Sequence, residues 1–175
     1  MKTSIHTLTV KASADHAWKI IGEEFVPVDK WMEAISSADA IPGPALPGAP
    51  AKGRTSHLRG KFAHVYQSEV ITAYSDAART ISTEVTINNL PRMVPMKGYN
   101  ATIVVKETGP ESCSITYTGE ARTKWFGKPM KNALTKSMDA GYLRGLEELA
   151  HYIETGEQHP RKVETVQADA AIAAA

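Results

Sequence analysis

The segment from Phe126 to Gly156 constrains the fold most, because its apolar residues recur at helical spacing over several turns. Charged residues fall largely on the other faces, which predicts an amphipathic helix lying against an apolar surface. Gly141 and Gly145 lie on or beside the apolar stripe, although glycine lowers helix stability by about 1 kcal/mol relative to alanine. Two interpretations remain open. The glycines either keep the helix wall low and leave space beside it, or they allow close packing against the partner surface.

Upstream of this helix the pattern is that of β-strands. Alternation and β-branched residues predict strands at 5–11, 33–41, 52–60, 62–74, 79–88, 99–106 and 112–122. The third and fourth of these are expected to join tightly around Gly60. Two short helices are expected after the first strand, one from the N-cap Ser13 to Gly22 and one after Pro27. An antiparallel sheet with helices on one side is an α+β architecture.

The chain of 175 residues fits one domain. We expect residues 1–156 to form it, and residues 157–175, which are polar and end in AAIAAA, to be a frayed or disordered tail. Two proline-containing loops are expected at 42–51 and 89–98. The second carries apolar residues, which indicates a loop that folds over something, either as a gate or as a permanent cap on the core.

Composition and motifs argue against several classes of function. The formal net charge is +1 without a clustered basic face, so nucleic-acid binding is not expected, and the short run 122–126 indicates a strand-to-helix corner. The six histidines show no metal-binding spacing, and no nucleotide-binding or nucleophile-elbow motif is present, so we expect no metal and no cofactor. Cys113 is the only cysteine and reads as a buried thiol. With no signal-like N-terminus and no apolar run of ~20 residues, we expect a cytoplasmic protein without a membrane span, as monomer or homodimer.

Four local signatures match a known pattern. They are the entry 10–18 into the first helix, Trp31 after the second helix, Gly53 opening a strand, and a hairpin carrying Glu69, Asp76 and Arg79. With the order of elements, they resemble the START-like (SRPBCC, helix-grip) superfamily over about residues 3 to 155, which includes polyketide cyclase/dehydrase-like proteins. The resemblance implies a curved antiparallel sheet of about seven strands wrapped around a long C-terminal helix. It also implies a cavity between them for an apolar or amphipathic small molecule.

We predict that this cavity receives side chains from the sheet, the helix and the second loop. The candidate ligand-binding residues are Trp31, His57, Arg59, Glu69, Thr83, Val85, Met93, Tyr99, Ile103, Tyr117, Met138 and Tyr142. Trp31 could instead be a core plug, and each tyrosine a core ring with its hydroxyl bonded to backbone. On strand 52–60, His57 and Arg59 share parity, and Leu58 is the alternative inward residue. The arginine that the superfamily often places here would fall near Ser56, where this chain departs from the pattern.

Glu69 is the candidate catalytic residue. It shares strand parity with Val65 and Ile71 and could point inward, where a carboxylate in an apolar cavity would suit general acid or base catalysis. The alternative is a rim residue paired with a lysine or arginine.

Three functions are compatible with these residues. The favoured one is binding of a lipid, polyketide or aromatic metabolite, because the predicted pocket lacks an obvious reactive cluster. The second is a cyclase/dehydratase in which Glu69 removes a proton α to a carbonyl while Tyr99, Tyr117 or Arg59 steadies the enolate oxygen. The third is an interaction protein whose cavity is incidental.

Overall fold

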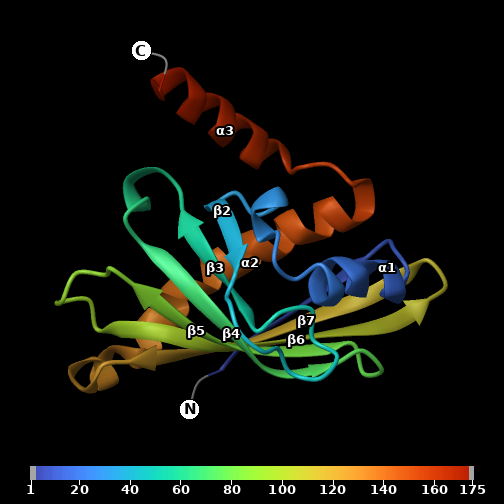
Figure 1. Cartoon of the computed structure of the whole chain (residues 1–175), viewed down its shortest axis with the longest axis horizontal. Helices are drawn as coiled ribbons and strands as arrows, with labels where there is room; N and C mark the ends of the chain where they lie inside the picture. The colour runs from blue at the N-terminus through green and yellow to red at the C-terminus, as the bar shows by residue number, and fades with distance from the viewer. Residues whose placement is uncertain (1–2, 174–175) are drawn as a thin grey trace.

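A seven-stranded antiparallel sheet curves around one long helix in the computed structural model, which describes residues 3–173 (Figure 1). The strand order is β1-β7-β6-β5-β4-β3-β2. The strands are β1 (Ser4–Val10), β2 (Ile35–Ala40), β3 (Gly53–Leu58), β4 (Tyr66–Ser75), β5 (Thr80–Asn88), β6 (Met96–Gly109) and β7 (Ser112–Thr123). From β2 to β7 each strand pairs with the next along the chain, and β1 adds to the far edge of β7. The predicted helix-grip architecture is confirmed.

Short helical segments follow β1, as the sequence predicts. They are α1 (Ala14–Trp18), its continuation as a π-helical turn η1 (Lys19–Glu23), and the 3-10 turn η2 (Val28–Lys30). Ser13 caps α1, because its hydroxyl oxygen accepts the His16 N–H at 3.2 Å. The predicted tight turn at Gly60 is wrong. A 3-10 turn, η3 (Gly60–Phe62), lies between β3 and β4, so β4 begins only at Tyr66.

The long helix α2 (Lys131–Thr155) is shorter at its start than the segment predicted from Phe126. Residues before it form a 3-10 turn, η4 (Trp125–Met130), which contains Pro129, a residue disfavoured inside an α-helix. At the other end Gly156 adopts φ +73° and donates its N–H to the Tyr152 carbonyl at 2.9 Å. This left-handed cap ends the helix as glycine typically does.

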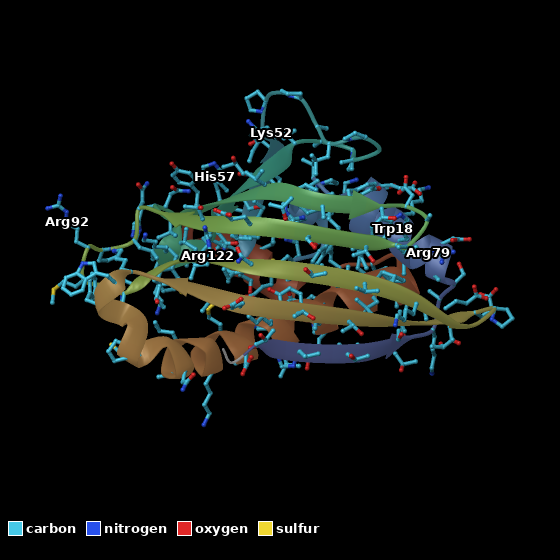
Figure 2. All side chains as sticks on the ribbon, turned by 90° about the horizontal axis from the view of Figure 1, so that it is seen from below. Trp18, Lys52, His57, Arg79, Arg92 and Arg122 are labelled. Carbon is cyan, nitrogen blue, oxygen red and sulfur yellow. The ribbon has the colours of Figure 1, made fainter. Side chains whose placement is uncertain are left out.

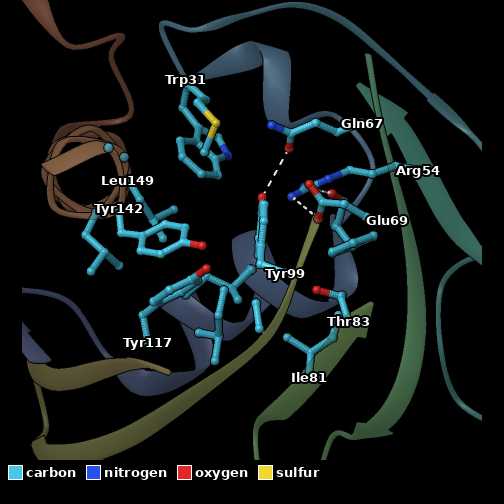
Figure 3. A pocket seen from close by; sticks show the side chains of 18 of the residues that line it. Trp31, Arg54, Gln67, Glu69, Ile81, Thr83, Tyr99, Tyr117, Tyr142 and Leu149 are labelled. Atoms are coloured by element: carbon cyan, nitrogen blue, oxygen red, sulfur yellow. Dashed lines mark hydrogen bonds and ion pairs between the residues drawn. The ribbon is translucent and has the colours of Figure 1, made fainter. Parts of the chain in front are cut away.

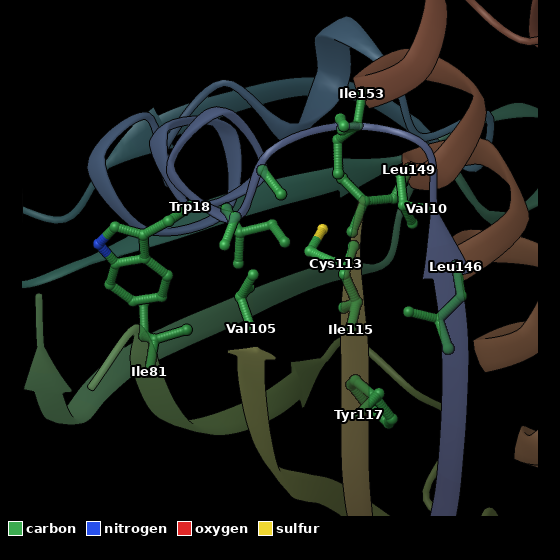
Figure 4. Packing of buried hydrophobic residues seen from close by; sticks show 14 of the residues in the cluster. Val10, Trp18, Ile81, Val105, Cys113, Ile115, Tyr117, Leu146, Leu149 and Ile153 are labelled. Atoms are coloured by element: carbon green, nitrogen blue, oxygen red, sulfur yellow. The ribbon is translucent and has the colours of Figure 1, made fainter. Parts of the chain in front are cut away.

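The hydrophobic core occupies one end of the space between sheet and helices (Figure 4). Trp18 from α1, Cys113 and Ile115 from β7, and Leu149 and Ile153 from α2 meet there. The Cys113 thiol is buried, as the sequence indicates, and burial raises its pKa. Because this packing involves the C-terminal half of α2, space remains between the middle of the helix and the sheet.

The C-terminal segment 157–175 contains a third helix, α3 (Pro160–Ala173), where the sequence indicated a frayed or disordered tail (Figure 1). Polar bonds attach α3 to the domain. The buried Lys162 donates its ammonium to the Met32 carbonyl at 3.0 Å, and Arg59 pairs with Asp169 at 3.1 Å. The sequence of α3 carries no apolar stripe that would predict a helix, because charged side chains make the contacts between α3 and the domain. Among residues 3–173, no helix is long and apolar enough to cross a bilayer.

Candidate functional site

A cavity of about 120 Å³ lies between the concave face of the sheet and the middle of α2 (Figure 3). Its apolar wall comes from the α1–η1 region, the sheet and α2. These residues include Ile20, Ile21, Phe25, Ile81, Ala101, Ile103, Leu146 and Leu149. Polar side chains are placed at intervals on this wall, namely Arg54, Gln67, Glu69, Thr83, Tyr99, Tyr117 and Tyr142. Apolar walls with a few placed polar groups are typical of small-molecule pockets.

The structure brings together on this cavity more than half of the predicted ligand-binding residues. They are Trp31, Glu69, Thr83, Tyr99, Ile103, Tyr117 and Tyr142. Trp31 serves both of its proposed roles, since it lines the cavity and also packs against the core. No residue of the loops 42–51 or 90–96 lines the cavity, so the structure offers no contact through which either loop would gate it.

The other predicted residues do not line the cavity. Val85 is fully buried in the sheet, and Met93 lies in a loop with 90% of its surface exposed. Met138 only touches a lining residue, its sulfur lying 3.8 Å from the Tyr142 hydroxyl. His57 is exposed with its ring 5.7 Å from that of Tyr66. Arg59 donates to the carbonyl oxygens of Glu33 and Ile35.

The parity predicted for β3 is therefore wrong. Arg54, not His57 or Arg59, points into the cavity from this strand, and Ser56 is buried on the same parity. Arg54 and Ser56 have the parity of Leu58, the alternative that the sequence left open. Arg54 is the main site residue that sequence reasoning missed. The feature that identifies Arg54 is the register between β3 and β4, in which Arg54 lies directly opposite Glu69.

Glu69 and Arg54 form a buried ion pair on the cavity wall. The Arg54 Nη2 donates to the Glu69 Oε2 at 2.8 Å, and Nη1 donates to the Phe25 carbonyl at 2.6 Å. The guanidinium also stacks 4.2 Å from the Phe25 ring centroid, a cation–π contact. Both alternatives for Glu69 hold in part, because the side chain faces the cavity and is also paired with an arginine. The isolated carboxylate that the catalytic hypothesis assumed is not present.

Three tyrosines form a cluster opposite this ion pair. The Tyr99 and Tyr142 rings meet edge to face with centroids 5.5 Å apart, and the Tyr117 and Tyr142 centroids are 4.7 Å apart. Gly119 makes this possible, because a Cβ there would lie 2.8 Å from the Tyr117 ring and 3.2 Å from the Tyr142 ring. Burial raises the pKa of each of the three hydroxyls, that of Tyr99 and Tyr117 furthest. They are neutral hydrogen-bonding groups at physiological pH.

The hydroxyls of this cluster do not bond to backbone, contrary to the alternative left open by the sequence. Tyr99 donates to the Gln67 side-chain oxygen at 3.1 Å, and Tyr142 points at the Met138 sulfur. The Tyr117 hydroxyl is buried and forms no hydrogen bond of good geometry among the described residues, although it interacts with the neighbouring Tyr142 hydroxyl. The Arg54 Nε on the same wall is also buried without a hydrogen-bond partner among the described residues. An unsatisfied buried polar group costs about 1–3 kcal/mol, so a ligand atom that bonds to either group would stabilise the site.

Gly141 and Gly145 lack side chains and so leave space on the side of the cavity that α2 forms. A Cβ at Gly141 would meet no atom within 4 Å, and one at Gly145 would meet only the Met32 Cε at 3.4 Å. Close packing is therefore not their role, and the interpretation that they leave space holds. Gly141 is also exposed to solvent while lining the cavity, so the cavity reaches the surface beside it.

Within residues 3–173 no cluster of three or more histidine, cysteine, aspartate or glutamate side chains could hold a metal ion.

Comparison with known proteins gives one family match and many structural matches. A family model described as polyketide cyclase/dehydrase and lipid transport matches residues 2–154. No curated protein matches the sequence. A START superfamily protein from Mycobacterium smegmatis is similar in structure, with a TM-score of 0.68, 14% identity, and coverage of 87% of this chain and 97% of that one.

Two further solved structures carry names that describe an activity. The di-domain ARO/CYC protein BexL of the BE-7585A biosynthetic pathway has a TM-score of 0.69 at 15% identity, over 88% of this chain and 47% of BexL. Norcoclaurine synthase from Thalictrum flavum has a TM-score of 0.60 at 21% identity, over 88% of this chain and 94% of the synthase. At these identities the similarity concerns the fold alone.

Proposed function

This chain belongs to the polyketide cyclase/dehydrase and lipid transport family, and we propose that it binds a small, largely apolar molecule in the cavity between the sheet and α2. The observation that carries the proposal is a mostly apolar cavity wall on which the buried Tyr117 hydroxyl forms no hydrogen bond of good geometry among the described residues. A ligand that places a hydroxyl or carbonyl oxygen against Tyr117 would satisfy this group while filling the space.

The cavity volume narrows the class of ligand. About 120 Å³ is close to the ~150 Å³ of an apolar cavity known to take benzene, and well below the ~300–1,000 Å³ of drug-sized pockets. A single aromatic ring with one polar substituent fits this space, whereas a multi-ring polyketide or an acyl chain would require α2 to move. Of the ligands that the sequence suggested, an aromatic metabolite is therefore favoured.

Titration with phenol and toluene, followed by calorimetry or by methyl NMR shifts, tests this proposal. Tyr117→Phe should weaken phenol binding about fivefold, the worth of one hydrogen bond, and leave toluene binding unchanged. Tyr152→Phe is the matched control on α2, since Tyr152 does not line the cavity. If neither compound binds and no small molecule co-purifies in native mass spectrometry, the cavity is incidental and an interaction role takes precedence.

A second candidate is catalysis of the cyclase/dehydratase type, favoured by the position of Glu69 across the cavity from the tyrosine cluster (Figure 3). In that reaction a Glu69 oxygen would take a proton α to a carbonyl, and a tyrosine hydroxyl would donate to the enolate oxygen. Arg54 already occupies Glu69 Oε2, which makes this candidate weaker. Glu69→Gln separates the two functions, because a carrier keeps its affinity for apolar ligands whereas an enzyme loses turnover.

A further inference from the structure

Large apolar side chains gather at the end of the molecule opposite the core. Met93 is 90% exposed and Trp125 is 82% exposed, and Phe126 and Met130 are exposed beside them. We call these four residues the aromatic end. Clustered exposed apolar residues in a soluble protein typically mark an interaction site. Neither the cavity nor the core makes use of them.

The aromatic end is a fixed platform built from two segments distant in sequence. The Lys124 N–H donates to the Pro95 carbonyl at 2.9 Å, and its ammonium donates to the Arg92 carbonyl at 3.0 Å. A Cβ at Gly127 would lie 2.6 Å from the Pro95 carbonyl oxygen, so glycine lets η4 approach the loop. Figure 2 shows Arg92 at the far end of the molecule from Trp18 and Arg79.

The two segments that form the aromatic end are rich in basic residues. The two segments that form it, 85–105 and 121–138, contain no aspartate or glutamate, while the chain as a whole has a formal net charge of only +1. Their basic residues are Arg92, Lys97, Arg122, Lys124, Lys128, Lys131 and Lys136. Arg122 is partly neutralised by its ion pair with Glu84. The remaining positive charge complements an anionic partner surface.

A groove beside the aromatic end concentrates part of this charge. It has a volume of about 370 Å³ and is lined by Lys97, Arg122 and Lys124, with the amides Asn88 and Asn89. Ammonium, guanidinium and amide N–H groups are the donors that bind phosphate oxygens. The side-chain amides of Asn88 and Asn89 already donate to protein oxygens, so the ammonium groups of Lys97 and Lys124 are the donors that would meet a phosphate-bearing headgroup here. The apolar residues next to the groove suit the hydrocarbon boundary.

We propose that the aromatic end docks on the surface of a membrane that contains anionic lipids, a role that goes beyond ligand binding in the cavity. Tryptophan flanked by lysine and arginine is the composition of membrane-interface anchors. The shape agrees with a bilayer better than with a protein partner. Side chains exposed as fully as Met93 and Trp125 protrude from the surface, and protruding apolar groups insert between headgroups without needing a matching concave partner.

Docking would also orient the cavity. Gly141, where the cavity reaches the surface, lies about 16 Å along α2 from Met130. A protein held at its aromatic end therefore presents the cavity mouth a short distance above the headgroups. An apolar ligand dissolved in the bilayer would have a short path to the cavity.

Co-sedimentation with phosphatidylcholine vesicles, with and without about one third phosphatidylserine, tests the proposal. We expect binding only to the anionic vesicles, and loss of binding when salt rises from about 0.1 to about 0.5 M. Trp125→Ala should lower the partition coefficient at least about fivefold, and Lys97→Gln about fivefold. Ile172→Ala on α3 and Lys61→Gln on η3 are matched exposed controls and should bind as the unmodified protein does.

Fluorescence quenching by brominated lipid locates the contact. Of the three tryptophans, Trp18 is buried and Trp31 is half-buried against the core, so vesicle-dependent quenching should come mainly from the exposed Trp125 and should largely disappear in Trp125→Ala. The proposal is overturned if anionic vesicles do not bind the protein, or if Trp125→Ala binds them as well as the unmodified chain. It is equally overturned if Trp125→Ala abolishes a dimer in sedimentation while vesicles stay unbound. Because Trp125 is remote from the cavity, phenol binding reports separately on the proposed function.

Discussion

Replacing Gly141 by alanine should stabilise the protein. Gly141 lies in the middle of α2 with helical backbone geometry, and a Cβ built there meets no atom within 4 Å. The substitution therefore introduces no clash and removes only the conformational freedom of glycine in the unfolded chain. We expect the free energy of unfolding to rise by about 0.5–1 kcal/mol. For a chain of this length that corresponds to a midpoint increase of about 1–4 °C.

Gly156→Ala is the matched control of opposite sign. A Cβ at Gly156 also meets no atom within 4 Å, but this residue has φ +73° at the end of α2. Alanine in that left-handed conformation costs about 1–2 kcal/mol, so the free energy of unfolding should fall. The two variants differ in backbone conformation and not in steric contact, so their comparison isolates the effect of conformation.

Urea unfolding followed by circular dichroism measures both changes, with an unchanged m-value as the check that the unfolded state is the same. A decrease in stability for Gly141→Ala would refute the reasoning, because it would mean that the helix wall is packed and not open. Gly141→Leu extends the test to the cavity. Its larger side chain should obstruct the opening and reduce phenol binding without a comparable loss of stability.

Other predictions concern buried charges and tyrosines. Glu69→Ala leaves the buried Arg54 guanidinium without its ion-pair partner and should lower the unfolding free energy by about 3 kcal/mol or more. Asp15→Ala breaks an exposed ion pair and should lower it by less than about 1 kcal/mol in the same urea assay. Glu148→Ala removes a side chain that is 2% exposed, so it should likewise lower the unfolding free energy by about 3 kcal/mol. The neighbouring Glu147 side chain is 57% exposed, so Glu147→Ala should lower it by less than about 1 kcal/mol. Burial raises the pKa of the three cavity tyrosines above the usual 10.0, so their contribution to stability is complete below pH 10 and is lost as pH rises above it. Tyrosinate absorbance should show this delayed ionisation, and Tyr142→Phe should make the alkaline loss of stability shallower; an equal slope would contradict the prediction.

Local patterns were enough to predict most of the fold. Alternation along β5, β6 and β7 placed Thr83, Tyr99 and Tyr117 on one face, and these residues line the cavity together. The Ser13 cap and the glycine after α2 marked helix boundaries correctly, because capping depends on a few neighbouring residues. Periodicity and capping act over one turn or one strand, so they can be read without knowing the partner surface.

The β3–β4 hairpin shows where local patterns fail. The sequence favoured His57 and Arg59 as inward residues because the START-like superfamily often places an inward arginine in this part of the strand. The structure places Arg54 opposite Glu69 instead. A change of one residue in parity exchanges the two faces of a strand, so favouring the parity of Arg59 was enough to hide Arg54.

The sequence did not predict helix α3 for a different reason, because the helix is attached by ion pairs and hydrogen bonds to residues far away in the chain. Arg161 bonds to Glu147 and Glu148, and Lys162 to a carbonyl more than a hundred residues upstream. A polar, alanine-rich segment gives no sign of such partners.

The α+β helix-grip fold and the tyrosine-bearing faces of the sheet could be predicted from the chain alone, because alternation and capping are local properties. The role of Gly141 and Gly145 stayed open until the structure showed empty space beside them. The folded structure was needed to show that Glu69 is paired with Arg54, that the Tyr117 hydroxyl forms no hydrogen bond of good geometry among the described residues, and that the cavity has a volume of about 120 Å³. Ion pairing, hydrogen-bond satisfaction and volume depend on distances between residues that the chain brings together only when it folds.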